Sequence, residues 1–137
     1  MRTEVLIAGL VLLALYNLGL ALFMVVSPHS FFTSIGPFGD YNRHYLGDLA
    51  TYGAAIGAGC AVALRRASWR VPVLAISTLQ FALHTINHLV DIDAAHPAWT
   101  GYFDFFSLLV TTLTLAWLTV LALGRSAERD ALTGSGR

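Results

Sequence analysis

Two pairs of potential metal ligands occur in the sequence, each with the four-residue spacing that places both side chains on one face of a helix. His84 and His88 form one pair, and His44 and Asp48 form the other. Neutral imidazoles and carboxylates are ligands that suit Zn, Cu and Fe ions. We therefore predict a mixed nitrogen and oxygen site in which these four side chains bind a transition metal ion.

Further polar residues are expected beside these ligands, where they would orient the rings. Carboxylates often accept the second ring N–H of a metal-bound histidine. The predicted supporting residues are Asp91, Asp104, Asn42 and Gln80. The single cysteine, Cys60, belongs to a segment of small residues and indicates packing, so a thiolate site is not expected.

The same residues allow two other interpretations. Histidine and aspartate side chains inside a helical bundle can hydrogen-bond to one another and fix the helix register without any metal. A haem held between His44 and His88 is the lesser alternative, because the macrocycle also needs a flat apolar slot. Small residues are expected toward the opposite leaflet, where they favour close helix contact; they are Gly53, Ala54, Gly57, Ala58 and Gly59.

The composition identifies the kind of element that must position these residues. The chain has 137 residues, of which 56% are hydrophobic and 12% are charged, with 8 basic and 8 acidic residues. Soluble domains usually carry about 25% charged residues. The composition therefore argues against a soluble fold, and the zero formal charge provides no basic surface for nucleic acid.

Four apolar runs are long enough to cross a bilayer, which takes about 20 helical residues. They cover residues 5–26, 44–64, 71–90 and 102–123, and short connections join them. Short connections make sequential helices antiparallel neighbours. We predict an all-α, polytopic membrane protein with a single domain over residues 1–137, a four-helix up-down transmembrane bundle, and a loose polar tail at 124–137.

The arginines predict the orientation of this bundle, because cytoplasmic segments carry an excess of basic residues. Seven of the eight arginines are expected on one side of the membrane, and Arg43 is expected on the other. The seven are Arg2, Arg65, Arg66, Arg70, Arg125, Arg129 and Arg137. Both termini of a multi-pass cell-membrane protein are therefore expected in the cytoplasm. All five histidines then lie at the outer end, as do Asp40, Asp48, Asp91, Asp93 and Asp104.

Helical spacing sorts the polar residues of the later spans into rows. One row comprises Ser77, Gln80, His84, His88 and Asp91, and the other comprises Asp104, Ser107, Thr111 and Thr114. Because a polar group facing lipid costs several kcal/mol, both rows are expected to turn inward and meet near the outer leaflet. Asn17 of the first span is expected to form a hydrogen bond between helices, with the floor of a cavity as the lesser alternative.

The segment Asp40-Tyr41-Asn42-Arg43-His44-Tyr45-Leu46-Gly47-Asp48, with His84-x-x-x-His88-Leu89 later, resembles a group of uncharacterised actinobacterial four-helix membrane proteins that are loosely DoxX-like. The group shows Tyr-Asn-x-His-x-x-x-Asp at the start of its second helix and paired histidines at the end of its third. The matching positions are Tyr41, Asn42, His44, Asp48, His84 and His88. Gly47 and Asp91 depart from the pattern, where the group often has arginine and a further histidine. DoxX relatives are associated with quinone or sulfur redox partners, but a shared fold does not supply an activity.

The preferred functional hypothesis is a small redox or hydrolytic membrane enzyme, or an accessory subunit, with a metal at the outer end. The metal would activate water or a small redox partner, with Asp48 or Asp91 as the base. The alternatives are a scaffold or accessory subunit held together by a metal-free polar network, and a small transporter or proton path. Expected partners are the lipid bilayer and either another membrane protein or a second copy of the chain.

Overall fold

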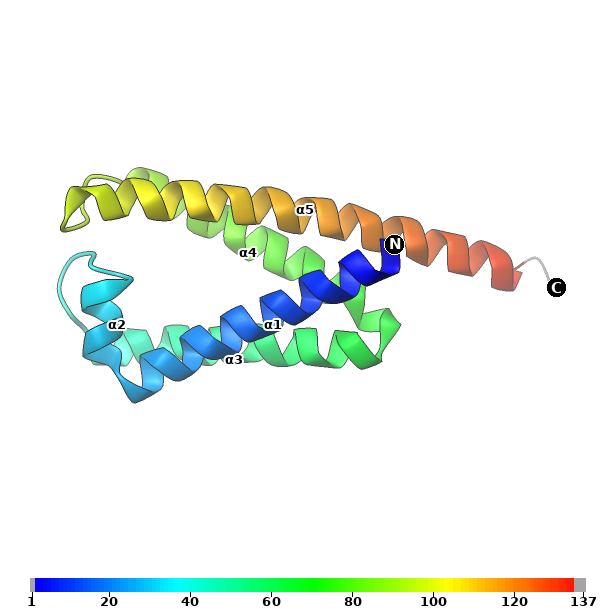
Figure 1. Ribbon diagram of the computed structural model, residues 1–137, viewed down its shortest axis with the longest axis horizontal. Helices are drawn as coiled ribbons and strands as arrows, with labels where there is room; N and C mark the ends of the chain where they lie inside the picture. Colours follow the sequence, from blue (N-terminus) through cyan, green and yellow to red (C-terminus); the bar gives the residue numbers. More distant parts are fainter. Residues whose placement is uncertain (1, 135–137) are drawn as a thin grey trace.

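The computed structural model describes residues 2–134, and nearly all of these residues are helical (Figure 1). The helices are α1 (Arg2–Val26), α2 (Pro28–Ser34), α3 (Arg43–Arg65), α4 (Arg70–Val90) and α5 (Ala98–Gly134), with a short 3-10 turn, η1 (Ala67–Trp69), before α4. The predicted all-α fold is confirmed.

Four segments have the length and composition needed to cross a membrane, and they coincide with the four predicted spans. They are Thr3–Val26, Arg43–Arg65, Ala67–Val90 and Ala98–Glu128. Large apolar side chains stay exposed on their flanks, for example Leu12, Leu79 and Leu113 at 60–70% of full exposure (68%, 61% and 62%). Such surfaces suit contact with acyl chains, so the chain has the character of a multi-pass membrane protein.

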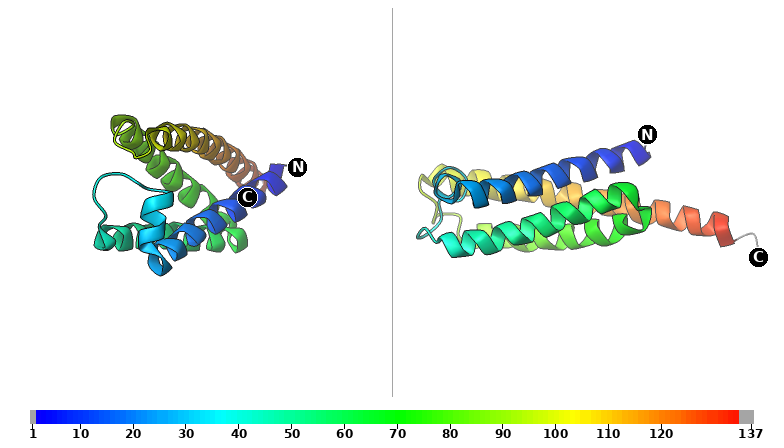
Figure 2. Two further views of the ribbon diagram at one scale, coloured as in Figure 1. Left: turned by 60° about the vertical axis from the view of Figure 1, so that its left-hand side comes forward. Right: turned by 90° about the horizontal axis from the view of Figure 1, so that it is seen from below.

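The four long helices pack as two antiparallel pairs. Helix α1 packs mainly against α3, and α4 packs mainly against α5, while the contacts between the two pairs are fewer. The pairs lie close together near the N-terminus and diverge toward the end that carries α2 (Figure 1; Figure 2, left). The result is an up-down bundle that is more open at one end than at the other.

Small residues allow the close contact between α1 and α3. A Cβ atom added to Gly57 would lie 2.6 Å from Cγ of Leu18, and one added to Gly53 would lie 3.4 Å from the backbone oxygen of Asn17. The Cys60 side chain is fully buried in the same core. The small residues of α3 therefore serve close packing, as the sequence predicted.

Threonine hydroxyls join α4 to α5. The Oγ1 atoms of Thr78 and Thr119 lie 2.9 Å apart, and those of Thr85 and Thr112 lie 3.0 Å apart. Both pairs lie within the spans, where a hydroxyl needs a partner because water is absent. These contacts fix the register of the second helix pair.

The two connections at the α2 end of the bundle touch each other and tie the helix pairs together. Phe38 and Ala95 form an isolated antiparallel β-bridge, and the backbone N–H of His96 donates to the carbonyl of Pro37 over 3.3 Å. Gly39 adopts a left-handed backbone with φ of 59°, which favours glycine. Residues 35–42, which we call the strap, thus reach from the first pair to the second.

Three details differ from the sequence-based expectations. The connection expected after the first span contains helix α2, which begins at Pro28, a residue favoured at the first helical position. The tail expected to be loose from 124 onward is helical to Gly134, since good helix formers such as Ala127 and Ala131 continue the pattern; the expectation for 135–137 lies outside the described residues. Asn17 donates to Leu13 of its own helix rather than to another helix.

Candidate functional site

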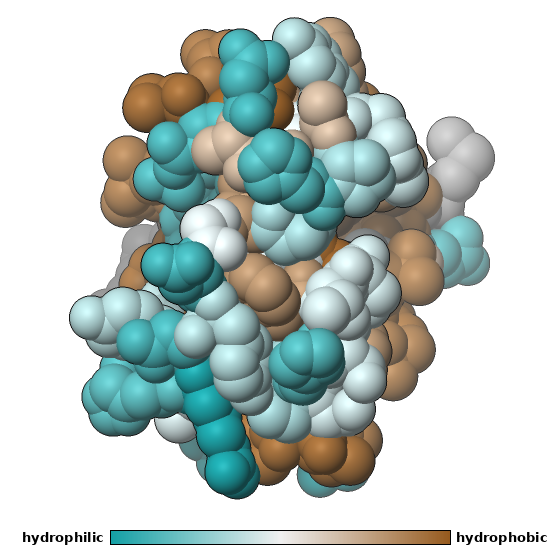
Figure 3. All heavy atoms as spheres, turned by 90° about the vertical axis from the view of Figure 1, so that its left-hand side faces the viewer, coloured by the Kyte–Doolittle hydropathy of each residue, from teal (hydrophilic) through white to brown (hydrophobic). Residues whose placement is uncertain are grey.

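Polar side chains gather at the end of the molecule that carries α2, the strap and the α4–α5 connection, which we call the polar end. Figure 3 views this end directly and shows hydrophilic residues across it, with hydrophobic residues on the flanks. A polar cap on an apolar bundle is expected where helices leave the hydrocarbon for the headgroups. The histidine pair of α4 lies in the last two turns before this cap.

His84 and His88 stack face to face on consecutive turns of α4. Their ring centroids are 4.7 Å apart and the ring planes differ by 10°. Both side chains are partly buried. The Phe38 ring of the strap packs on His88 in a T-shaped arrangement, with a centroid distance of 4.8 Å and an interplanar angle of 85°. The strap therefore holds the His88 ring from the side of the polar end.

Gln80 contacts the other member of the pair. Its Nε2 atom lies 3.4 Å from Nδ1 of His84, one helical turn further along the same face. An amide nitrogen only donates, so Nδ1 of His84 accepts and its proton sits on Nε2. Gln80 thus occupies the supporting position that the sequence predicted for it, beside a predicted ligand.

Among the described side chains, three buried polar atoms have no hydrogen-bond partner: Ser77 Oγ, His88 Nδ1 and Asp104 Oδ2. Buried polar atoms are almost always paired, and an unpaired one points to a bound group or water. The sequence singled out all three residues: His88 as a ligand, Asp104 as a supporting residue and Ser77 as part of a polar row. Asp104 also lies within electrostatic range of the Tyr16 hydroxyl, and Asp91, at the C-terminal end of α4, lies within range of His88.

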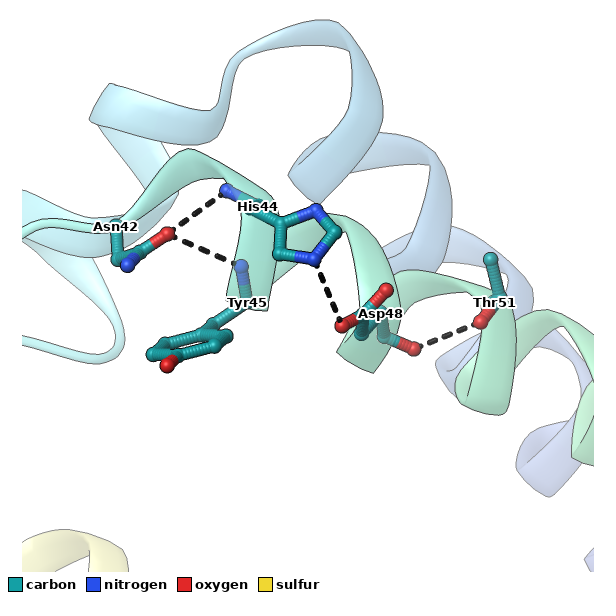
Figure 4. A network of polar contacts seen from close by, with 5 residues as sticks. All are labelled: Asn42, His44, Tyr45, Asp48 and Thr51. Atoms are coloured by element: carbon teal, nitrogen blue, oxygen red, sulfur yellow. Dashed lines mark hydrogen bonds and ion pairs between the residues drawn. The ribbon is translucent and has the colours of Figure 1, made fainter.

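The second predicted pair, His44 and Asp48, lies on the outer surface at the start of α3 (Figure 4). Nε2 of His44 is 3.6 Å from Oδ2 of Asp48, and the two side chains are 80% and 69% exposed. The side chain of Asn42 caps the helix, with its Oδ1 accepting from the backbone N–H groups of His44 and Tyr45 over 3.0 and 3.3 Å. Asn42 therefore supports the helix start rather than a ligand ring.

The structure brings the four predicted ligands together as two pairs, not as the single shell that the sequence predicted. Among the side chains that the structure describes, no three from His, Cys, Asp or Glu are arranged to hold one metal ion. The reason is the rotation of α3 about its axis. Its buried face, which includes Ala50, Gly57 and Cys60, turns toward the core, and this leaves the first-turn pair facing outward.

The predicted polar row of α5 does not turn inward as a unit. Ser107 and Thr114 are exposed, and the hydroxyls of Thr111 and Thr114 donate to carbonyls of their own helix. The inward positions belong to Thr112 and Thr119, which the sequence analysis did not select. Their seven-residue spacing, which recurs at Thr78 and Thr85 of α4, is the signal that would have found this contact.

An open groove runs along the surface between α3 and α4, which we call the α3–α4 groove. It has a volume of about 530 Å³ and is lined by Tyr52, Ile76, Leu79, Gln80, Leu83 and His84. Most of this surface is apolar, and the predicted ligand His84 forms part of its wall. The groove therefore gives His84 a side that opens toward the lipid.

Comparisons of the chain with family models, curated proteins and solved structures found no match. The resemblance to DoxX-like proteins thus stays a prediction. What the site can do chemically follows from its own residues: two adjacent imidazoles, an amide that orients one of them, and unpaired buried polar atoms at the same end of the bundle.

Proposed function

We propose that this chain is a small multi-pass membrane protein that binds a transition metal ion through His84 and His88 at its polar end. The observation that carries the proposal is the stacked ring pair, in which Nδ1 of His88 is buried without a partner. Two histidines one turn apart on a helix present their rings to the same side and are a recurrent zinc-binding pair. A bound cation would supply the partner that the ring nitrogen lacks.

The surrounding residues fit a Zn, Cu or Fe ion bound by imidazole. Gln80 lies beside Nδ1 of His84 and can orient the ring in the metal-bound form as well. With the ion on Nε2, the ring carries its proton on Nδ1, and the Gln80 amide must turn so that its Oε1 accepts that proton. Two protein ligands leave coordination positions open for water or substrate, and an open position distinguishes catalytic metal sites, which usually have three protein ligands, from closed structural ones. We therefore favour a small membrane enzyme, or an accessory subunit that presents the ion, over a purely structural metal site.

The proposal uses two of the four predicted ligands. The outer pair, His44 and Asp48, stays exposed and interacts within its own helix, so we assign it no part in holding the ion. The second candidate function is a scaffold subunit with a metal-free polar network. The threonine contacts between α4 and α5 favour this alternative, because they bind the helices without any ion.

Elemental analysis of the detergent-purified protein tests the proposal. We expect close to one transition metal ion per chain, and its loss in the double variant His84→Ala with His88→Ala. The matched control replaces two exposed histidines of the polar end, His29 in α2 and His96 in the α4–α5 connection, by alanine and should keep the ion. A metal-free wild-type protein, or equal loss in both variants, would contradict the proposal.

Two further readouts separate the alternatives. A Soret band in the absorption spectrum would put haem in place of a metal ion. If the His84/His88 double variant loses as much thermal stability in chelator as in metal-containing buffer, the metal-free network accounts for the site. The proposal predicts that the thermal stability of the double variant is lower than that of the wild type mainly when metal is present. Metal binding stabilises the wild type, whereas the variant cannot bind the ion.

A further inference from the structure

We infer that the connection between α3 and α4 binds the phosphate group of an anionic phospholipid through Arg65, Arg66 and Arg70. The connection lies at the end of the bundle opposite to α2, far from the histidine pair (Figure 1). The lipid site is therefore separate from the proposed metal site, and neither depends on the other. Three features support it: the charge of the connection, the hydrogen bond that positions Arg70, and the depth of the connection in the bilayer.

Positive charge without a counter-charge is concentrated in this connection. By sequence, this end of the bundle carries seven of the eight arginines and three of the eight acidic residues, a formal excess of four positive charges. Arg65 and Arg66 are exposed and Arg70 is partly buried. Among the described side chains, no carboxylate forms an ion pair with any of the three. Arginines clustered beside a membrane in this way attract anionic headgroups.

A hydrogen bond fixes the orientation of the Arg70 side chain. Its Nε–H donates to the carbonyl of Ala63 in the last turn of α3 over 3.3 Å. The two Nη groups at the end of the guanidinium keep their N–H donors, because they form no hydrogen bond with a described residue. This end of the guanidinium matches two oxygens of a phosphate group, which arginine binds through two parallel hydrogen bonds.

The start of α4 adds to the attraction for an anion. No side chain caps the N-terminus of this helix, and its first turn contains no acidic residue. The positive end of the helix dipole therefore acts together with the guanidinium of Arg70, which is the first residue of α4.

The depth of the connection favours a lipid over a soluble phosphate. Helix α3 ends at Arg65 and α4 begins at Arg70, and both helices belong to candidate membrane spans. The ring of Trp69 between them is 46% exposed, and indole rings prefer the interface between hydrocarbon and headgroups. A phosphate at this depth belongs to a lipid, whose acyl chains would cover the apolar flanks of the helices.

Arginines at the end of a span also act as topology signals, and Arg70→Lys separates the two roles. A topology signal needs positive charge, which lysine keeps. The phosphate site also needs the planar guanidinium and its hydrogen bond to Ala63, which lysine lacks. Arg70→Lys should therefore lower the preference for anionic lipid by about fivefold, the effect of one net hydrogen bond. An unchanged preference would reduce the arginines to topology signals.

Native mass spectrometry of the detergent-purified protein with equimolar phosphatidylglycerol and phosphatidylcholine measures this preference. The wild-type protein should retain one phosphatidylglycerol in preference to phosphatidylcholine. Each arginine of the connection that is replaced by glutamine should lower the ratio of the two adducts by at least about fivefold. The triple variant should bind both lipids equally; it combines Arg65→Gln, Arg66→Gln and Arg70→Gln.

The charge-matched control removes three arginines of α5 and the tail and should keep the preference. It combines Arg125→Gln, Arg129→Gln and Arg137→Gln. The two threonine contacts between α4 and α5 share one register, which places Arg125 within about 3 Å of the depth of Arg70. The control therefore tests whether charge at this depth is sufficient. The His84/His88 double variant should also keep the preference, so the result does not depend on the metal proposal.

Three results would overturn the inference. Equal retention of both lipids by the wild type would show that no site exists, and equal loss in the triple variant and its control would make net charge the cause. Displacement of the phosphatidylglycerol adduct by inorganic phosphate would make the ligand a soluble phosphate. Circular dichroism establishes that each variant is folded. Where the triple variant does not fold, the exposed Arg66→Gln variant alone should show the fivefold loss.

Discussion

At the scale of single residues, the orientation of the His84 ring depends on one neighbour. Gln80 reaches its Nδ1 atom from the preceding turn, and His88 covers the ring face on the other side. A ring held on two sides loses little rotational freedom when it binds a ligand. Gln80 therefore acts on the proposed ion through the ring and not by contact.

Replacing Gln80 by leucine should lower metal affinity by about 10- to 100-fold, the usual cost of losing such a supporting partner. Affinity is measured by competition with a chromogenic chelator in detergent. Asn87→Leu is the matched control, because Asn87 is an exposed amide on the same helix. An equal loss in both variants would show that the effect comes from polarity in general and not from the contact with His84.

At the scale of helices, the α1–α3 contact depends on the absence of side chains at defined positions. Gly57 faces Leu18 of α1, including its backbone nitrogen at 3.2 Å from an added Cβ, whereas an added Cβ at Gly47 of the same helix meets nothing within 4 Å. The two glycines thus offer a comparison in which helix propensity is the same and packing differs.

Gly57→Ala should destabilise the protein by about 1–3 kcal/mol, because the added methyl group forces the helices apart. Gly47→Ala should be neutral or stabilising by up to about 1 kcal/mol, because alanine is the better helix former. Unfolding by a denaturing detergent, followed by circular dichroism, measures both. Equal stability of the two variants would mean that Leu18 can move away from the added methyl group without loss of stability.

The sequence was sufficient to predict the helices but not their rotation about their own axes. The apolar runs located all four spans because bilayer thickness fixes their length. By contrast, Thr85 and His84 are neighbours on α4, and spacing alone did not tell which of them faces α5. Likewise, nothing local to His44 and Asp48 indicates that the small residues later in α3 turn this pair outward. Contacts between helices decide such rotations.

In the candidate site too, contacts within one helix were predictable from the sequence and contacts between segments were not. The His84–His88 pair and the position of Gln80 beside it follow from i,i+4 spacing within one helix, and the structure places the three residues together. Phe38 could not be predicted as a neighbour of His88, because the strap reaches it only through the bridge to Ala95. Residue spacing therefore could not predict the contacts between segments that are far apart in the sequence.

At the scale of the whole molecule, the arginine distribution predicts that the polar end faces outward and that both termini lie in the cytoplasm. Two exposed serines mark the opposite ends of the bundle, Ser30 in α2 and Ser68 in η1. With Cys60 fully buried, single cysteines at these serines provide specific labelling sites.

In intact cells, Ser30→Cys should react with a membrane-impermeant maleimide, and Ser68→Cys should react only after permeabilisation. The wild-type chain, whose Cys60 is buried, is the control and should remain unlabelled in both conditions. The reverse pattern would place the histidine pair on the cytoplasmic side.

The division of the bundle into two helix pairs has a consequence for its biosynthesis. Each pair consists of spans that follow one another in the chain, and most contacts of each span lie within its own pair. During translation, α1 and α3 can associate as a hairpin in the membrane before α4 has left the ribosome. The second hairpin then joins a partner that is already assembled, and the strap can meet Ala95 only after α4 has been made, because Ala95 follows α4 and precedes α5.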